Sequence, residues 1–146
     1  MSLVTRRTPP PEHHAAFRLD GSNGSASVAR GCARAYLDQC VPALTQDVTA
    51  DALVVVSELV TNAVNHAPGP CCLYLVEDEG ELTIAVSDDS VVVPVAKTPD
   101  IAGSGGFGWH LLRRLAQHVD VYVRPPWGKT VSATVRIFSL VAPTAT

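Results

Sequence analysis

Residues 51–67 read DALVVVSELVTNAVNHA, and this stretch decides the fold of the chain. Its apolar residues recur every three or four positions, which predicts one long amphipathic helix with a single buried face. The apolar positions are Leu53, Val56, Val60, Ala63 and Val64. Asp47, Thr49 or Asp51 is expected to cap the start of this helix, and the Pro-Gly-Pro sequence at 68–70 is expected to end it.

Three polar residues, Glu58, Asn62 and His66, follow one another at steps of four along this helix. Each step advances only about 40° around the helix axis, so the three side chains project from one edge, beside the apolar face. A polar rim with i,i+4 pairing and a functional site both fit this spacing. Spacing alone leaves the two interpretations open.

After the helix, the apolar period changes to two. Residues 71–76 and 81–87 alternate and predict a β-hairpin, joined by the acidic turn at 77–80. Asp88 comes directly after the second strand. It is interpreted either as a residue that starts a turn or as a ligand contact at the strand end.

Residues 89–106 have no clear period and predict a long loop, a feature that is usually functional or disordered in a compact domain. The loop ends in the glycine-rich string GSGGFG at 103–108, where a helix over 107–118 is predicted. Backbone N–H groups at such a position form an anion site. The string matches G-x-G-x-x-G, but the dinucleotide-binding context is missing because no first strand of a βαβ unit precedes it directly.

The remaining segments complete a single domain over residues 15–140. A short strand at 17–19 and a helix at 27–40 precede the long helix, and strands at 120–124 and 130–138 end the domain. The order β-α-α-β-β-loop-α-β-β predicts an α+β fold: a two-layer α/β sandwich with a mixed, mostly antiparallel sheet and helices on one face. Residues 1–14 are expected to be a disordered tail, and 141–146 a C-terminal tail.

Composition excludes several classes of protein. The chain has 146 residues, 47% of them hydrophobic and 17% charged, which is typical of a globular domain. Its net charge of −3 argues against direct nucleic-acid binding, and no apolar run is long enough for a membrane span. The four cysteines are expected to be reduced thiols, which together with the absence of a signal peptide predicts a cytoplasmic protein.

The order and spacing of these motifs resemble the GHKL (Bergerat-fold) ATPase superfamily over about residues 17–138. The similarity is greatest to the anti-sigma-factor serine/threonine kinase branch and its HATPase_c-type regulatory relatives in bacteria. SELVTNAVNHA at 57–67 is similar to the N-box of that branch, and IAVSDDS at 84–90 to its G1 box. GGFGWHLLRRLA at 105–116 is similar to the G2 box, and GKTVSATV at 128–135 to the strand that closes the pocket.

The resemblance implies a role for each matching residue. Asn62 would hold Mg²⁺ and contact ATP, Glu58 would be the catalytic base or orient the attacking hydroxyl, and His66 would lie near the phosphates. Asp88 would accept a hydrogen bond from the adenine amino group. The other implied ATP contacts are Ser90 in the G1 box, Gly106 and Gly108 at the start of the G2 helix, and Thr130 on the adenine side. Residues 89–105 would form the ATP lid.

The implied activity is ATP- and Mg²⁺-dependent phosphorylation of a serine on a small STAS-type anti-anti-sigma protein, with binding of a sigma factor as a further possibility. Homodimers also occur in this branch. A non-catalytic regulatory binding module is the alternative, because Ser90 and Val92 stand where the G1 box usually has glycines. The catalytic part of a sensor kinase is less favoured, since no phosphoacceptor helical hairpin is expected before residue 17.

Overall fold

The computed structural model describes residues 13–40, 43–67, 69–92 and 107–137 of the chain. Five strands form one sheet in the order β1-β2-β3-β5-β4. The strands are β1 (His13–Leu19), β2 (Cys71–Asp78), β3 (Glu81–Asp88), β4 (His118–Arg124) and β5 (Gly128–Arg136). All four neighbouring strand pairs in these ranges are antiparallel. The α+β class is therefore confirmed, and the predicted mixed sheet is antiparallel throughout the described strands.

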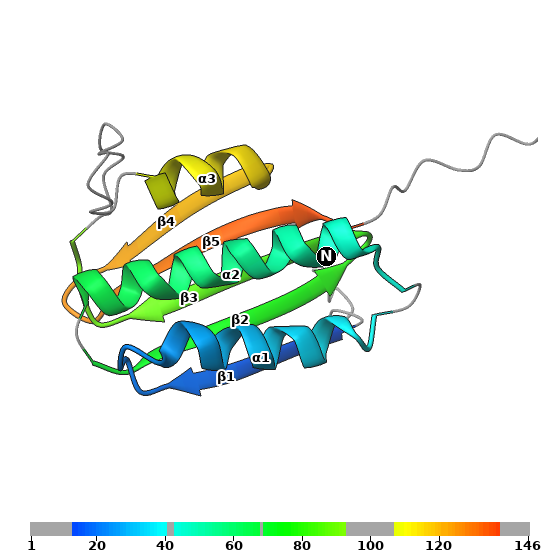
Figure 1. Cartoon of the computed structure of the whole chain (residues 1–146). Coiled ribbons are helices and arrows are strands. Elements are labelled where there is room, and N and C mark those ends of the chain that lie inside the picture. The colour runs from blue at the N-terminus through cyan, green and yellow to red at the C-terminus, as the bar shows by residue number, and fades with distance from the viewer. Residues whose placement is uncertain (1–12, 41–42, 68, 93–106, 138–146) are drawn as a thin grey trace, which may run out of the picture.

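Three helices, α1 (Ser25–Leu37), α2 (Gln46–His66) and α3 (Phe107–Leu115), cover one face of the sheet (Figure 1). The core lies between the two layers. It is built from alternate residues of the strands, such as Leu82, Ile84 and Val86 of β3, and from the apolar face of α2. Because successive strand residues point to opposite faces, the other half of each strand lies on the face without helices. The predicted two-layer sandwich with helices on one face is confirmed.

The long helix begins earlier than its apolar period indicates. α2 starts at Gln46, and the Thr45 hydroxyl caps it by accepting a hydrogen bond from the Val48 N–H at 3.2 Å. The prediction of Asp47, Thr49 or Asp51 as the cap is wrong. A threonine three residues before the amide it binds satisfies one of the free N–H groups of the first turn, wherever the apolar stripe begins.

Strand ends also differ from the predicted ones. β1 begins at His13 and so includes the last two residues of the predicted disordered tail, while residues 1–12 and the predicted tail at 141–146 lie outside the described residues. β2 extends to Asp78, so Glu77 is a buried strand residue and not part of the turn. The turn is confined to Glu79 and Gly80, both of which have positive φ angles. Hydrogen bonding between paired strands continues beyond the residues at which the apolar alternation stops.

The structure also bears on the state of the cysteines and on membrane-spanning helices. All four cysteines are free, as predicted. Within the described residues, no helix combines the length and the apolar character that crossing a membrane requires.

Candidate functional site

The C-terminal half of α2 and the adjoining ends of β3 and β5 enclose a small cavity. Its volume is about 10 Å³, which is room for about one water molecule. The cavity is lined by Leu59, Asn62, Ala63, His66, Val86, Asp88, Lys129 and Val131. The structure therefore brings together three of the residues that the sequence singled out, Asn62, His66 and Asp88.

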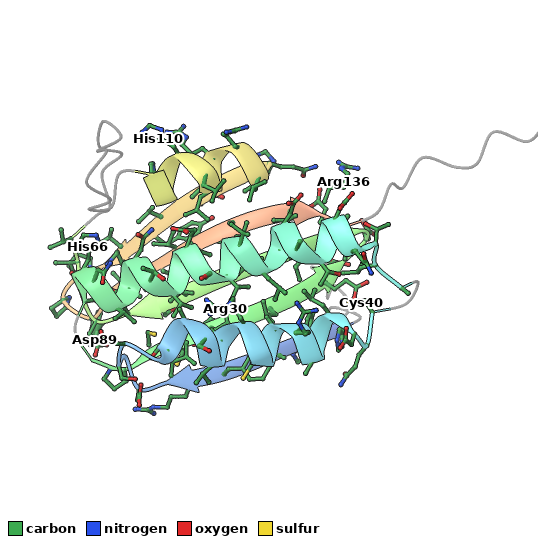
Figure 2. The ribbon with its side chains drawn as sticks, viewed as in Figure 1. Arg30, Cys40, His66, Asp89, His110 and Arg136 are labelled. Carbon is green, nitrogen blue, oxygen red and sulfur yellow. The ribbon has the colours of Figure 1, made fainter. Side chains whose placement is uncertain are left out.

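Helix α2 supplies the polar edge of this site. Asn62 is half-buried, and its side-chain amide makes no hydrogen bond to the side chains or backbone of the described residues. His66 is exposed in the last turn of the helix. Figure 2 shows His66 at the same end of the molecule as Asp89, the first residue after β3.

Glu58 lies one helical turn before Asn62 and does not line the cavity itself. Its side chain is half-buried, and this burial raises the pKa of its carboxyl above the ordinary value. Loss of hydration disfavours the charged form of an acid, so the carboxylate is a stronger base than an exposed glutamate. A base of this kind suits the abstraction of a hydroxyl proton.

Asp88 forms a buried ion pair with Lys129. The Lys129 ammonium donates to both oxygens of the Asp88 carboxylate at 2.9 Å, and each side chain is only 2% exposed. The two residues face each other across the β3–β5 ladder. Both point toward α2, because they continue the inward-facing alternation of Val86 on β3 and Val131 on β5.

The chain after β3 folds back onto this ion pair. The Ser90 N–H donates to Asp88 Oδ1 at 2.9 Å, and the Ser90 carbonyl accepts from Lys129 Nζ at 3.4 Å. The Ser90 hydroxyl in turn accepts a hydrogen bond from the Val92 N–H at 3.1 Å. These are Asx-type and Ser-type turns, in which a short side chain holds the backbone two residues on. Ser90 therefore anchors the start of the predicted lid, besides lying next to Asp88.

Gly128 permits the close approach of β5 to Asp88. It has a φ of +137°, and a Cβ atom placed on it would lie 2.0 Å from the Asp88 carbonyl oxygen. Only glycine fits this combination of backbone conformation and space. The glycine of the GKT sequence is thus required by strand packing beside the ion pair.

Thr130 does not line the cavity under α2, but it lines a second, larger cavity together with Asp88 and Lys129. Its side chain points to the sheet face without helices, where its hydroxyl is 2.7 Å from the Ser87 hydroxyl. The structure does not bring this side chain to the cavity under α2, because the neighbouring inward position belongs to Lys129. Of the two predicted glycine contacts, Gly108 lies in the first turn of α3, whereas Gly106 and residues 93–105 of the predicted lid lie outside the described residues.

Lys129 is the site residue that the sequence analysis missed. The signal was present: β5 buries Val131, Ala133 and Val135 on one face, and Lys129 continues that alternation. A lysine at an inward position requires an acidic partner, because an unpaired charge is costly to bury. The partner is the residue opposite it, Asp88, which is distant in sequence.

Comparison with known proteins agrees with this architecture. Residues 22–135 match the model of the histidine kinase-like ATPase domain family, and the chain belongs to this family. This confirms the resemblance to the GHKL ATPases. No curated protein matches the sequence.

Among solved structures, the chain is similar to the RsbU and RsbW domains of Rv1364c from Mycobacterium tuberculosis, with a TM-score of 0.62 and 19% identity. That match covers 87% of this chain and 32% of the other, so the chain spans about a third of that structure. The histidine kinase domain of the EL346 blue-light activated kinase from Erythrobacter litoralis matches with a TM-score of 0.45, 24% identity, and 62% and 45% coverage. The histidine kinase domain of the E. coli osmosensor EnvZ has a TM-score of 0.46, 12% identity, and 95% and 97% coverage.

Proposed function

We propose that the chain is an ATP-binding serine/threonine protein kinase of the anti-sigma-factor type. Its target would be a serine on a small STAS-type anti-anti-sigma protein, and it would also sequester such a protein or a sigma factor. The observation that carries the proposal is the convergence of Asn62, His66 and Asp88 on one cavity, with Glu58 one turn earlier on the same helix. These residue types suit nucleotide binding and phosphoryl transfer, which needs positioning and charge neutralisation more than covalent chemistry.

The donor set fits a magnesium nucleotide. Within the described residues, no group of three or more His, Cys, Asp or Glu side chains is arranged to hold a metal ion. Mg²⁺ takes few protein ligands when phosphates supply the others, and the amide oxygen of Asn62 is a ligand of the right kind. Bound in this way, Mg²⁺ would neutralise phosphate charge.

The other residues then have distinct tasks. Glu58 accepts the proton of the attacking serine hydroxyl, a role that its raised pKa favours. Asp88 accepts a hydrogen bond from the adenine amino group, and His66 lies on the phosphate side. Ser90 fixes the root of the lid through its bond to Asp88. Gly106 and Gly108 let the lid and the start of α3 approach the phosphates, whose negative charge a helix N-terminus attracts.

Partner and location follow from the same proposal. The phosphorylated serine would be carried by a separate protein that docks near the lid. A homodimer is compatible with this arrangement. The mild negative charge of the chain favours protein partners over nucleic acid, and the cytoplasm is where such partners and ATP meet.

The proposal is tested by transfer of labelled phosphate from ATP to a STAS-domain protein. Glu58→Gln should reduce the transfer rate by about 100-fold, the usual contribution of a general base, while leaving ATP affinity unchanged. Glu81→Gln is the matched control, because Glu81 is a glutamate whose side chain is 45% exposed, at the start of β3 and away from the cavity. Equal rates for wild type and Glu58→Gln would contradict the assigned role.

A second candidate function is a non-catalytic binding module with weak or lost nucleotide binding. The observation that favours it is the ion pair between Lys129 and Asp88, because it engages the acid that is proposed to bind adenine. Calorimetric titration with ATP and Mg²⁺ separates the two functions. Absence of binding at millimolar ATP would exclude the kinase and support the module.

A further inference from the structure

We propose that Lys129 is an internal competitor for the nucleotide base, and that its ion pair with Asp88 sets the affinity and base selectivity of the site. This inference rests on the proposed function, which assigns Asp88 to the adenine amino group. The geometry that supports it is direct: the Lys129 ammonium lies 2.9 Å from both oxygens of Asp88, the one acid among the described residues that line the cavity under α2.

Described residues already occupy most of the hydrogen-bond acceptor positions of the Asp88 carboxylate. A carboxylate offers about four acceptor positions. Lys129 takes one on each oxygen, and the Ser90 N–H takes a second position on Oδ1. The described residues therefore leave one position, on Oδ2, that a base could use unless the ammonium moves away.

The ammonium also changes the strength of that remaining bond. A free carboxylate forms a charge-assisted hydrogen bond, which is roughly twice as strong as a neutral one. Lys129 neutralises Asp88 at contact distance in a buried setting, so an amino group that approaches Oδ2 meets a weaker acceptor. The expected result is that wild-type protein gains little from the adenine amino group.

Lys129 also connects the base position to the lid. Its third hydrogen bond goes to the Ser90 carbonyl, at 3.4 Å. An ammonium displaced from Asp88 by a base must also leave or strain this bond at the root of the lid. Base binding and the position of residues 90–92 are therefore coupled through one side chain.

The test compares two ligands on three proteins by titration calorimetry with Mg²⁺. The ligands are ATP and purine riboside triphosphate, which lacks the amino group that would donate to Asp88. The proteins are wild type, Lys129→Met and Arg136→Met. Arg136 is the matched control because it lies on the same strand and pairs with Glu81 at 4.0 Å with both side chains about half exposed. Figure 2 shows it at the end of the sheet away from His66.

Wild type and Arg136→Met should favour ATP over the analogue by less than about threefold. Lys129→Met should bind ATP about tenfold more tightly than wild type, because it restores a charge-assisted bond, with little change for the analogue. A folded Lys129→Met protein with an unchanged ATP-to-analogue ratio would overturn the proposal. Should that variant fail to fold, the wild-type ratio decides alone, and a preference of threefold or more overturns the proposal.

These outcomes are separable from failure of the proposed function. If neither ligand binds any of the three proteins at millimolar concentration, nucleotide binding itself is refuted, and the role of Lys129 is refuted with it. If both ligands bind but Lys129→Met gains nothing for ATP, the nucleotide site stands and only the competition is refuted.

Discussion

Removing the Lys129 ammonium should strongly destabilise the fold. Lys129→Met keeps a straight, apolar side chain of similar length but leaves the Asp88 carboxylate buried at 2% exposure without a counter-charge. Breaking a buried ion pair from one side costs about 3–5 kcal/mol, because the remaining charge loses its partner and regains no water. For a domain of this size that corresponds to a fall in melting temperature of about 10–20 °C.

The assay is urea denaturation of four proteins, followed by circular dichroism: wild type, Lys129→Met, Asp88→Asn/Lys129→Met and Arg136→Met. The double variant removes both charges, so it should recover most of the lost stability. Arg136→Met breaks an exposed pair with a 4.0 Å separation, and pairs of that kind contribute less than about 1 kcal/mol.

Two results would exclude an unpaired buried charge as the cause of the destabilisation. A cost below about 1 kcal/mol for Lys129→Met would refute it, since a carboxylate that tolerates loss of its partner must have access to water. A double variant as unstable as the single one would also refute it. That result would show that packing of the lysine stem, and not its charge, holds β3 and β5 together.

Glu58, Asn62 and Gly128 can each be tested separately. Burial raises the pKa of Glu58, so the rate of phosphoryl transfer should increase with pH, with a midpoint above the ordinary glutamate pKa. A pH–rate profile without this rise would exclude Glu58 as the base. Stabilisation by ATP reaches about 2.7 kcal/mol when ATP is at 100 times its Kd. Asn62→Ala should abolish the Mg²⁺-dependent part of this thermal stabilisation. A variant that keeps the Mg²⁺-dependent part would place the metal elsewhere. Gly128→Ala should lower the free energy of unfolding by more than about 2 kcal/mol, because its Cβ would meet the Asp88 carbonyl oxygen. A urea midpoint of unfolding equal to that of wild type would contradict this.

The types of the helices and strands were predictable from the sequence because they depend on local periodicity. The apolar stripe of α2 and the alternation in β2 and β3 are both properties of short windows. The ends of these elements were less predictable. The Thr45 cap and the extension of β2 to Asp78 depend on hydrogen bonds that apolar residues do not reveal.

The residues of the candidate site were also predictable only in part. Glu58, Asn62 and His66 were predictable as a group, since a helix alone places residues at steps of four on one edge. The resemblance assigns Thr130 to the adenine side, and this stays a prediction; the structure places its hydroxyl beside that of Ser87, while Lys129 takes the inward position next to it. A shift of one residue along a strand changes the face of the sheet to which a side chain points.

The sequence by itself determined the class of fold, the family and the polar edge of α2, because each of these depends on the spacing of residue types along the chain. Only the tertiary structure decided what Asp88 contacts. Asp88 and Lys129 are 41 residues apart and meet because β3 and β5 pair in one register, with both side chains inward. No local pattern contains that register. The contact between Asp88 and Lys129 is therefore a product of strand pairing.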